Sequence, residues 1–227
     1  MLTVGLFLIL YVGIFGISLP MYIHYSQWNG INIIQILLAF FLVLNYLISL
    51  WEIGLGVHIK KIEKDYKQLK EKYKSNQFSA VVDFFNAPLS LHELFSLSFW
   101  TKVWSTYSLY DPSYSNKESF GFFIDVGNGW TTGVLSIVAL ISMTFDLDYI
   151  SARTIGILTL LKYYQELYGT VLYFLSFFMN ERYKGKTITE VLLFVGLSNG
   201  LWFFFPLLGI YASLHLIYSD TYAIYRS

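Results

Sequence analysis

Two acidic residues lie inside apolar stretches of this sequence, where they could carry proton chemistry. Glu52 lies in a long run of Leu, Ile and Phe, and Asp125 lies near the start of another such run. Neither has a basic residue within one helical turn on its own stretch. An ionisable group in a membrane helix is costly unless it faces the interior of a bundle, so each acid is a functional candidate. Two such acids can add a proton to a substrate and remove one from it.

Amide side chains lie at helical spacing from both acids. Asn45 precedes Glu52 by seven residues, which is two helical turns, and Asn128 follows Asp125 by three. Each pair therefore lies on one face of its helix. The two amides are candidates for orienting a ligand, with interhelical hydrogen bonding as the alternative.

A third polar pair, Asn199 and Trp202, lies in the last apolar stretch. The face of an indole ring attracts a cation, so Trp202 could stabilise a carbocation formed between proton addition and proton removal. Asn199 is a ligand-orienting candidate like the other amides. Because Trp202 is followed by three Phe residues, an aromatic packing stripe or interfacial belt is the alternative reading.

The fourth apolar stretch contains Lys162, Glu166 and Tyr168. Lys162 and Glu166 are four residues apart and can pair with each other on one helix face, so we interpret them as a structural ion pair or as a pair whose charged ends reach the membrane surface. Tyr168 joins the ligand-binding candidates.

Several functional classes are excluded by composition and by missing motifs. Only 13% of the residues are charged, against about 25% in soluble domains, so the main solvent is lipid. The formal net charge is zero, which argues against nucleic-acid binding. Without Cys there are no disulfides or thiolate ligands. No zinc-protease, serine-hydrolase or nucleotide-binding motif occurs, so we expect no metal, nucleotide or redox cofactor.

Five apolar runs are long enough to cross a membrane, which takes roughly 20 residues in a helix. We therefore predict an all-α integral membrane protein in which five transmembrane helices form a bundle around a cavity open to lipid. Small residues near Asp125 predict close helix packing; they are Gly127, Gly129 and Gly133. The five runs are 2–23, 31–57, 120–145, 154–179 and 188–218.

The predicted organisation has one membrane domain and one long polar connection. Residues 1–30 form the first span and its connection, 31–218 form a four-helix domain, and 219–227 form a short tail. The connection at 58–118 opens with a Lys-rich segment in which Glu63 and Lys67 are at helical spacing, so we expect the second helix to continue into water. The mixed apolar stretch that follows predicts an interfacial helix or cap.

Charge is unevenly distributed between the predicted loops. Nine Lys lie in the 58–118 connection, and three further basic residues lie in the loop after the fourth run. The positive-inside rule places this face and the N-terminus in the cytosol.

Four segments of distinctive sequence follow one another along the chain: WSTYSLYDPSY at 104–114, DVGNGWTTGVLS at 125–136, YGTVLYF at 168–174 and NGLW at 199–202. In this order they resemble motifs of the emopamil-binding protein family, the sterol isomerases that carry the EXPERA domain. The resemblance covers about residues 42–215. Members of that family have five spans, as the apolar runs also indicate.

This resemblance implies a membrane enzyme of the endoplasmic reticulum that moves a sterol double bond from Δ8 to Δ7. By position, Glu52 matches the family's first acid and Asp125 its second, which is a Glu in the family. Asn45 matches an upstream Asp and Asn128 a Thr, while Asn199 and Trp202 match the residues that line the cavity. The family histidine one turn before the first acid is replaced by Ile48, which cannot handle protons. Family members usually end in a cytosolic basic tail, which conflicts with the charge count and leaves the orientation open.

The leading hypothesis is therefore a sterol double-bond isomerase. Its catalytic candidates are Glu52, Asp125 and Trp202, and its substrate-binding candidates are Asn45, Asn128, Tyr168 and Asn199. The expected partners are the membrane and a sterol or sterol-like lipid, and the sequence also allows a homodimer. Two alternatives remain open: a non-catalytic lipid-binding EXPERA protein, favoured by Ile48, and an isomerase or cyclase for another terpenoid.

Overall fold

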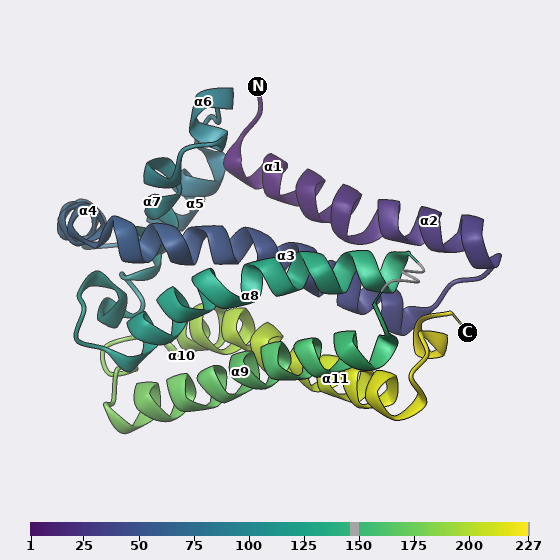
Figure 1. Cartoon of the computed structure of the whole chain (residues 1–227). Coiled ribbons are helices and arrows are strands. Elements are labelled where there is room, and N and C mark those ends of the chain that lie inside the picture. Colours follow the sequence, from purple (N-terminus) through teal and green to yellow (C-terminus); the bar gives the residue numbers. More distant parts are fainter. Residues whose placement is uncertain (146–149, 227) are drawn as a thin grey trace. The chain divides into compact units, whose positions relative to one another are not determined.

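The computed structural model describes residues 1–145 and 150–226 of the chain, and Figure 1 shows the helices along it. Within those residues the chain is helical and contains no β-strand; an isolated bridge joins Thr3 to Pro88. The predicted all-α class is confirmed for this part of the protein. Residues 146–149, in the predicted connection between the third and fourth runs, and residue 227 lie outside the description.

Four helical segments are long and apolar enough to cross a membrane. The first is Val4–Trp28, and the others correspond to the second, third and fifth predicted runs. The helix expected from the fourth run is present as α9, Ala152–Met179, but it is not among the four. Its crossing of the membrane stays a prediction. The remaining spanning segments are α3 (Ile33–Val57), α8 (Phe120–Thr144), and Ile188–Ser219, composed of α10 (Ile188–Glu190), η3 (Val191–Leu197) and α11 (Ser198–Ser219).

The first span contains a wider helical turn in its middle. It is built from α1 (Val4–Tyr11), the π-helical segment η1 (Val12–Ser18) and α2 (Leu19–Trp28). Pro20 at the start of α2 has no N–H to donate to the carbonyl of Gly16, and its ring crowds that carbonyl. A π-helical turn before the proline relieves this conflict.

The polar connection does not continue the second span, and this prediction was wrong. Helix α3 ends at Val57, and a separate helix α4, Ile59–Lys72, begins after His58. In Figure 1 α4 is seen end-on beside α3, so the chain turns sharply there. The cause is amphipathicity: α4 buries Ile59, Ile62 and Tyr66 on one face, which holds it against the protein. The predicted pair between Glu63 and Lys67 is confirmed on the exposed face, at 2.7 Å.

The mixed apolar stretch folds into short helices. They are α5 (Phe78–Asn86), α6 (Leu91–Leu94), α7 (Leu97–Tyr107) and the 3₁₀ turn η2 (Pro112–Ser115). Ser90 and Glu93 form a capping box at the start of α6, and Ser96 caps α7. Leu91 and Phe95 are largely exposed, which suits the expected position at a membrane surface.

The chain forms two compact units that do not follow sequence order. Unit 1 consists of Met1–Leu10, Ser49–Trp130 and Leu172–Asn199. Unit 2 consists of Tyr11–Ile48, Thr131–Val171 and Gly200–Ser227. Each contains parts of α3, α8 and α9.

Both units have aromatic interiors. In unit 1, Trp51 stacks on Trp100 with ring centroids 5.2 Å apart, and Trp104 Nε1 donates to the carbonyl of Trp51 at 2.7 Å. In unit 2, Phe41 and Phe205 stack within a buried cluster, and Gly209 packs directly on the ring of Tyr163. A Cβ at Gly209 would lie 2.5 Å from that ring, so α9 and α11 approach closely only because the residue is glycine.

Candidate functional site

The first candidate acid, Glu52, lies where α3 and α8 touch within unit 1. A Cβ on Gly129 of α8 would lie 2.9 Å from the Glu52 Cβ and 2.8 Å from the backbone nitrogen of Ile53. Gly56 of α3 makes a similar approach to Val126, at 2.9 Å. The predicted close packing is confirmed at Gly129 and is wrong at Gly127, where an added Cβ would meet nothing within 4 Å. The absence of side chains at these glycines therefore brings the two helices together at the turn that carries Glu52.

The second acid, Asp125, lies one helical turn before Gly129 on α8, and thus close to the same contact. The hydroxyl of Tyr114 in η2 hydrogen-bonds to the Asp125 carboxyl. Burial, and next the negative charge of Asp125, raises the pKa of Tyr114 well above its usual value. The phenol therefore stays protonated and donates. Among the residues that the structure describes, no Lys or Arg forms a salt bridge with Asp125.

The amides of unit 1 differ in burial. Asn128 is buried on α8, three residues beyond Asp125. Asn199, at the start of α11, is partly buried, and its Nδ2 donates to the Tyr107 hydroxyl at 3.0 Å. Unit 1 contains four of the candidate site residues: Glu52, Asp125, Asn128 and Asn199.

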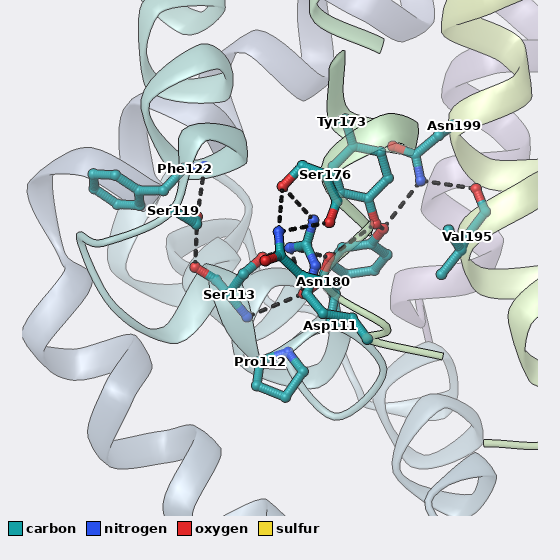
Figure 2. Close-up of polar contacts among 12 residues, drawn as sticks. Asp111, Pro112, Ser113, Ser119, Phe122, Tyr173, Ser176, Asn180, Val195 and Asn199 are labelled. Carbon is teal, nitrogen blue, oxygen red and sulfur yellow. Dashed lines mark hydrogen bonds and ion pairs between the residues drawn. The ribbon is translucent and has the colours of Figure 1, made fainter. Parts of the chain in front are cut away.

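Asn199 begins a directed chain of hydrogen bonds, much of which Figure 2 shows. The hydroxyls of Tyr107 and Tyr173 are 2.9 Å apart, and Tyr173 donates to Asp111 Oδ2 at 3.0 Å. Since the Tyr173 proton goes to the carboxylate, Tyr107 must donate to Tyr173 and accept from Asn199. Burial is the main cause that raises the pKa of Tyr107, which keeps this phenol neutral.

The chain ends in an ion pair between Asp111 and Arg182. Nη1 of Arg182 lies 3.0 Å from both oxygens of the fully buried carboxylate. The same nitrogen contacts the Ser113 hydroxyl, and Nη2 donates to Ser176 Oγ at 3.0 Å. Ser113 also donates its backbone N–H to Asp111 at 3.1 Å. The pair therefore fastens the 58–118 connection to the loop that follows α9.

Sequence reasoning assigned no role to Asp111, Arg182, Tyr107 or Tyr173. Asp111, Tyr107 and Tyr173 occur in segments that carry the family resemblance, which is the one signal that marked them. Arg182 is an ordinary loop residue by its sequence context. Its partner is 71 residues away, so no helical spacing could reveal the pair.

In unit 2 the predicted ion pair is present and fully buried. Lys162 Nζ lies 2.7 and 2.9 Å from the two oxygens of Glu166, and neither side chain is exposed. The ammonium also lies over the rings of Phe41 and Tyr163, at 5.2 and 4.5 Å from their centroids. Cation–π attraction and the carboxylate together compensate the buried positive charge.

Two of the predicted site residues join this pair. Asn45 Nδ2 donates to Glu166 Oε1 at 2.7 Å and to Ser136 Oγ at 3.1 Å. Trp202 Nε1 donates to Asn45 Oδ1 at 2.7 Å. The amide of Asn45 therefore connects the indole to the carboxylate. Asn45 and Glu52 share a helix but belong to different units.

Tyr168 does not join the Asn45 network. Its ring is half exposed and stacks on Tyr164, with centroids 6.0 Å apart and an interplanar angle of 13°. Its assignment to substrate binding stays a prediction.

No group of three or more His, Asp or Glu side chains among the described residues could hold a metal ion. The chemistry available at the sites above is that of carboxyl, phenol, amide and indole groups. Comparisons with protein-family models, with curated proteins and with solved structures gave no match to this chain.

Proposed function

We propose that this protein is a membrane-embedded isomerase that moves a double bond in a sterol or a related apolar lipid. The observation that carries the proposal is the pair of acids in unit 1. Glu52 is buried on α3 at its contact with α8, and Asp125 is partly buried on α8 one turn from that contact. Carboxyl groups inside apolar spans are rare and are functional candidates by default.

The proposed reaction needs only proton transfer. The Glu52 carboxyl gives its proton to one alkene carbon, which leaves a carbocation on the neighbouring carbon. Asp125 then takes a proton from the carbon on the other side, and the new double bond forms. One turnover leaves Glu52 ionised and Asp125 protonated, so a proton returns from one acid to the other before the next. Substrate and product are isomers, and no oxidant, reductant or group donor is consumed.

Tyr114 and Asn128 are the supporting residues of this proposal in unit 1. Tyr114 hydrogen-bonds to Asp125 and fixes the direction of its carboxyl group. Asn128 is buried on the same helix and is proposed to orient the ligand. The roles proposed for Trp202 as the cation-stabilising ring and for Asn45 and Asn199 as orienting amides rest on the family resemblance, as does a location in the endoplasmic reticulum.

The experiment is to express the chain in cells that lack sterol Δ8 to Δ7 isomerase and to profile their sterols by gas chromatography with mass spectrometry. We expect Δ7 sterols with the wild type. Glu52→Gln and Asp125→Asn should each lower their formation by about 100-fold or more, as loss of a general acid or base does. Glu63→Gln, at the exposed pair on α4, is the matched control and should keep full activity.

A second function, non-catalytic lipid binding, is favoured by one observation. Ile48 lies one turn before Glu52 on α3, and its side chain cannot relay a proton. A binding protein would leave Δ8 sterols unchanged while the wild type is well expressed. Equal Δ7 formation by the wild type and both acid variants would instead contradict the proposed mechanism.

A further inference from the structure

A cavity in unit 2 lies at the ends of two candidate membrane spans, and its lining includes neither acid of the proposed isomerase. Its volume is about 610 Å³, within the range of roughly 300–1,000 Å³ that is usual for small-molecule sites. Ile33 is the first residue of α3, and α11 ends at Ser219, shortly after the cavity residue His215. The cavity therefore lies at the ends of two helices that are long and apolar enough to cross a membrane.

The walls of this cavity are fixed by buried hydrogen bonds. Asn32 Nδ2 donates to the carbonyl of Ile224 at 3.0 Å, and Asn32 Oδ1 accepts from the Gln35 N–H at 2.8 Å. The ring of His24 contacts the carbonyls of Gly30 and Tyr225, at 2.9 and 2.7 Å. These contacts hold the segment after α11 against the start of α3. The cavity is thus a built feature of unit 2.

Two hydrogen-bonding side chains line the cavity one helical turn apart on α11. Among the described residues, the Tyr211 hydroxyl and His215 Nε2 have no hydrogen-bond partner, and His215 Nδ1 lies 3.4 Å from Ser219 Oγ. A phenol and an imidazole can each donate or accept. Together they suit a ligand group such as a hydroxyl, which also does both.

Apart from Tyr211, His215 and the Asn32 amide, the lining is apolar, and it is uncharged. Ile31, Ile33, Ile34 and Ile224 supply hydrocarbon surface, and none of the described residues that line the cavity is Lys, Arg, Asp or Glu. A phosphate would find no cationic partner here, because anions are bound in proteins mainly by Arg, Lys or helix N-termini. The lining therefore favours an amphipathic molecule with a neutral polar end.

We propose that this cavity binds the hydroxyl-bearing end of an uncharged amphipathic lipid, whose hydrocarbon part lies against the isoleucines. Tyr211 and His215 hydrogen-bond to the head group. The site is independent of the acids in unit 1 and of the proposed isomerase activity.

The test uses a photoreactive monoacylglycerol that carries a diazirine in its acyl chain, with the full chain purified in lipid nanodiscs. After irradiation, mass spectrometry of the peptides locates the label. We expect labelling concentrated at residues 31–34 and 211–224. Excess unlabelled monoacylglycerol should suppress it, and lysophosphatidic acid of the same chain length should not. Equal competition by the phosphate lipid would overturn the assignment to a neutral head group.

Two variants and one control test the geometry. Tyr211→Phe with His215→Leu should lower the labelling by roughly tenfold, because two hydrogen bonds to the ligand are lost. Ala223→Trp should block labelling by filling the cavity while both polar groups remain, because Ala223 is exposed and lines the cavity. Tyr218→Phe, on the same helix but outside the cavity, should change nothing. Labelling that is unchanged by Ala223→Trp, or spread along all spans, would overturn the site.

Discussion

Asp111 and Arg182 in unit 1 are separated by 71 residues, whereas Lys162 and Glu166 in unit 2 are four residues apart on one helix. The local pair can form as soon as α9 is helical, so by itself it specifies no tertiary contact. The distant pair forms only when the 58–118 connection meets the loop after α9. The Asp111–Arg182 ion pair therefore depends on the tertiary folding of unit 1, whereas the Lys162–Glu166 ion pair needs only the helix α9 in unit 2.

The two pairs also differ in their surroundings. Neither Lys162 nor Glu166 is exposed, and aromatic rings lie beside the ammonium. The Arg182 side chain keeps 15% of its surface exposed, so part of its charge stays hydrated. Removing one partner should accordingly cost more in unit 2 than in unit 1, because an unpaired charge is most unfavourable where no water reaches it.

The largest effect is expected for Lys162→Met. This change leaves Glu166 buried without its cation and should lower the free energy of unfolding by about 3–5 kcal/mol. Reversible unfolding in mixed detergent micelles measures it. The double variant Lys162→Met with Glu166→Leu should recover most of the loss, since an apolar pair of similar volume removes both charges. A small loss in the single variant would contradict the distinction between the two units.

Arg182→Met should have a smaller effect, about 2–3 kcal/mol. The Asp111 carboxylate then loses its cation but keeps its bonds from Tyr173 and from the Ser113 backbone. Limited proteolysis should also cut the 109–119 segment faster, because its fastening to the next loop is gone. Lys184→Met, at an exposed pair in the same loop, is the control and should leave the cleavage rate as it is.

Trp202→Phe should cost about 1 kcal/mol, which is typical of one interhelical hydrogen bond in a membrane protein. The indole N–H that bonds to Asn45 is lost, while the aromatic packing is largely kept. The same unfolding assay measures it, with Trp130→Phe at an exposed position of α8 as the control. Equal effects of the two changes would show that the Asn45 bond to the indole does not contribute to unit 2.

The smallest effect is expected for Tyr110→Phe in unit 1, which should change how the stability of the protein depends on pH in alkaline solution. Burial, and next the charge of Glu190, raises the pKa of Tyr110 from 10.0 to about 12. Between pH 10 and 12 the unfolded chain loses this phenolic proton while the folded chain keeps it, so stability falls as the pH rises. Tyr110→Phe should make that fall shallower. Identical pH profiles for the variant and the wild type would contradict the assigned shift.

The positions of the spanning helices were predictable because a long apolar run has one stable solution in lipid, a hydrogen-bonded helix. The Lys162–Glu166 pair followed from helical spacing for the same local reason. The break after Val57 was missed because helical propensity continues through Lys60 to Lys74, and only the burial of Ile59, Ile62 and Tyr66 turns α4 aside. Tertiary packing overrode a correct local signal.

The candidate site, too, was predictable from the sequence only in its local features. Residue types and periodicity marked Glu52, Asp125 and Trp202, because acids and an indole in apolar runs stand out against hydrocarbon neighbours. Periodicity could not show that Trp202 bonds to Asn45, that Tyr114 bonds to Asp125, or that Arg182 closes a chain of phenols at Asp111. Composition and short-range spacing determine which segments are helical and which side chains are out of place in lipid, because both depend on neighbours along the chain. The partners of those side chains depend on contacts between segments that are far apart in sequence, and these exist only in the folded protein.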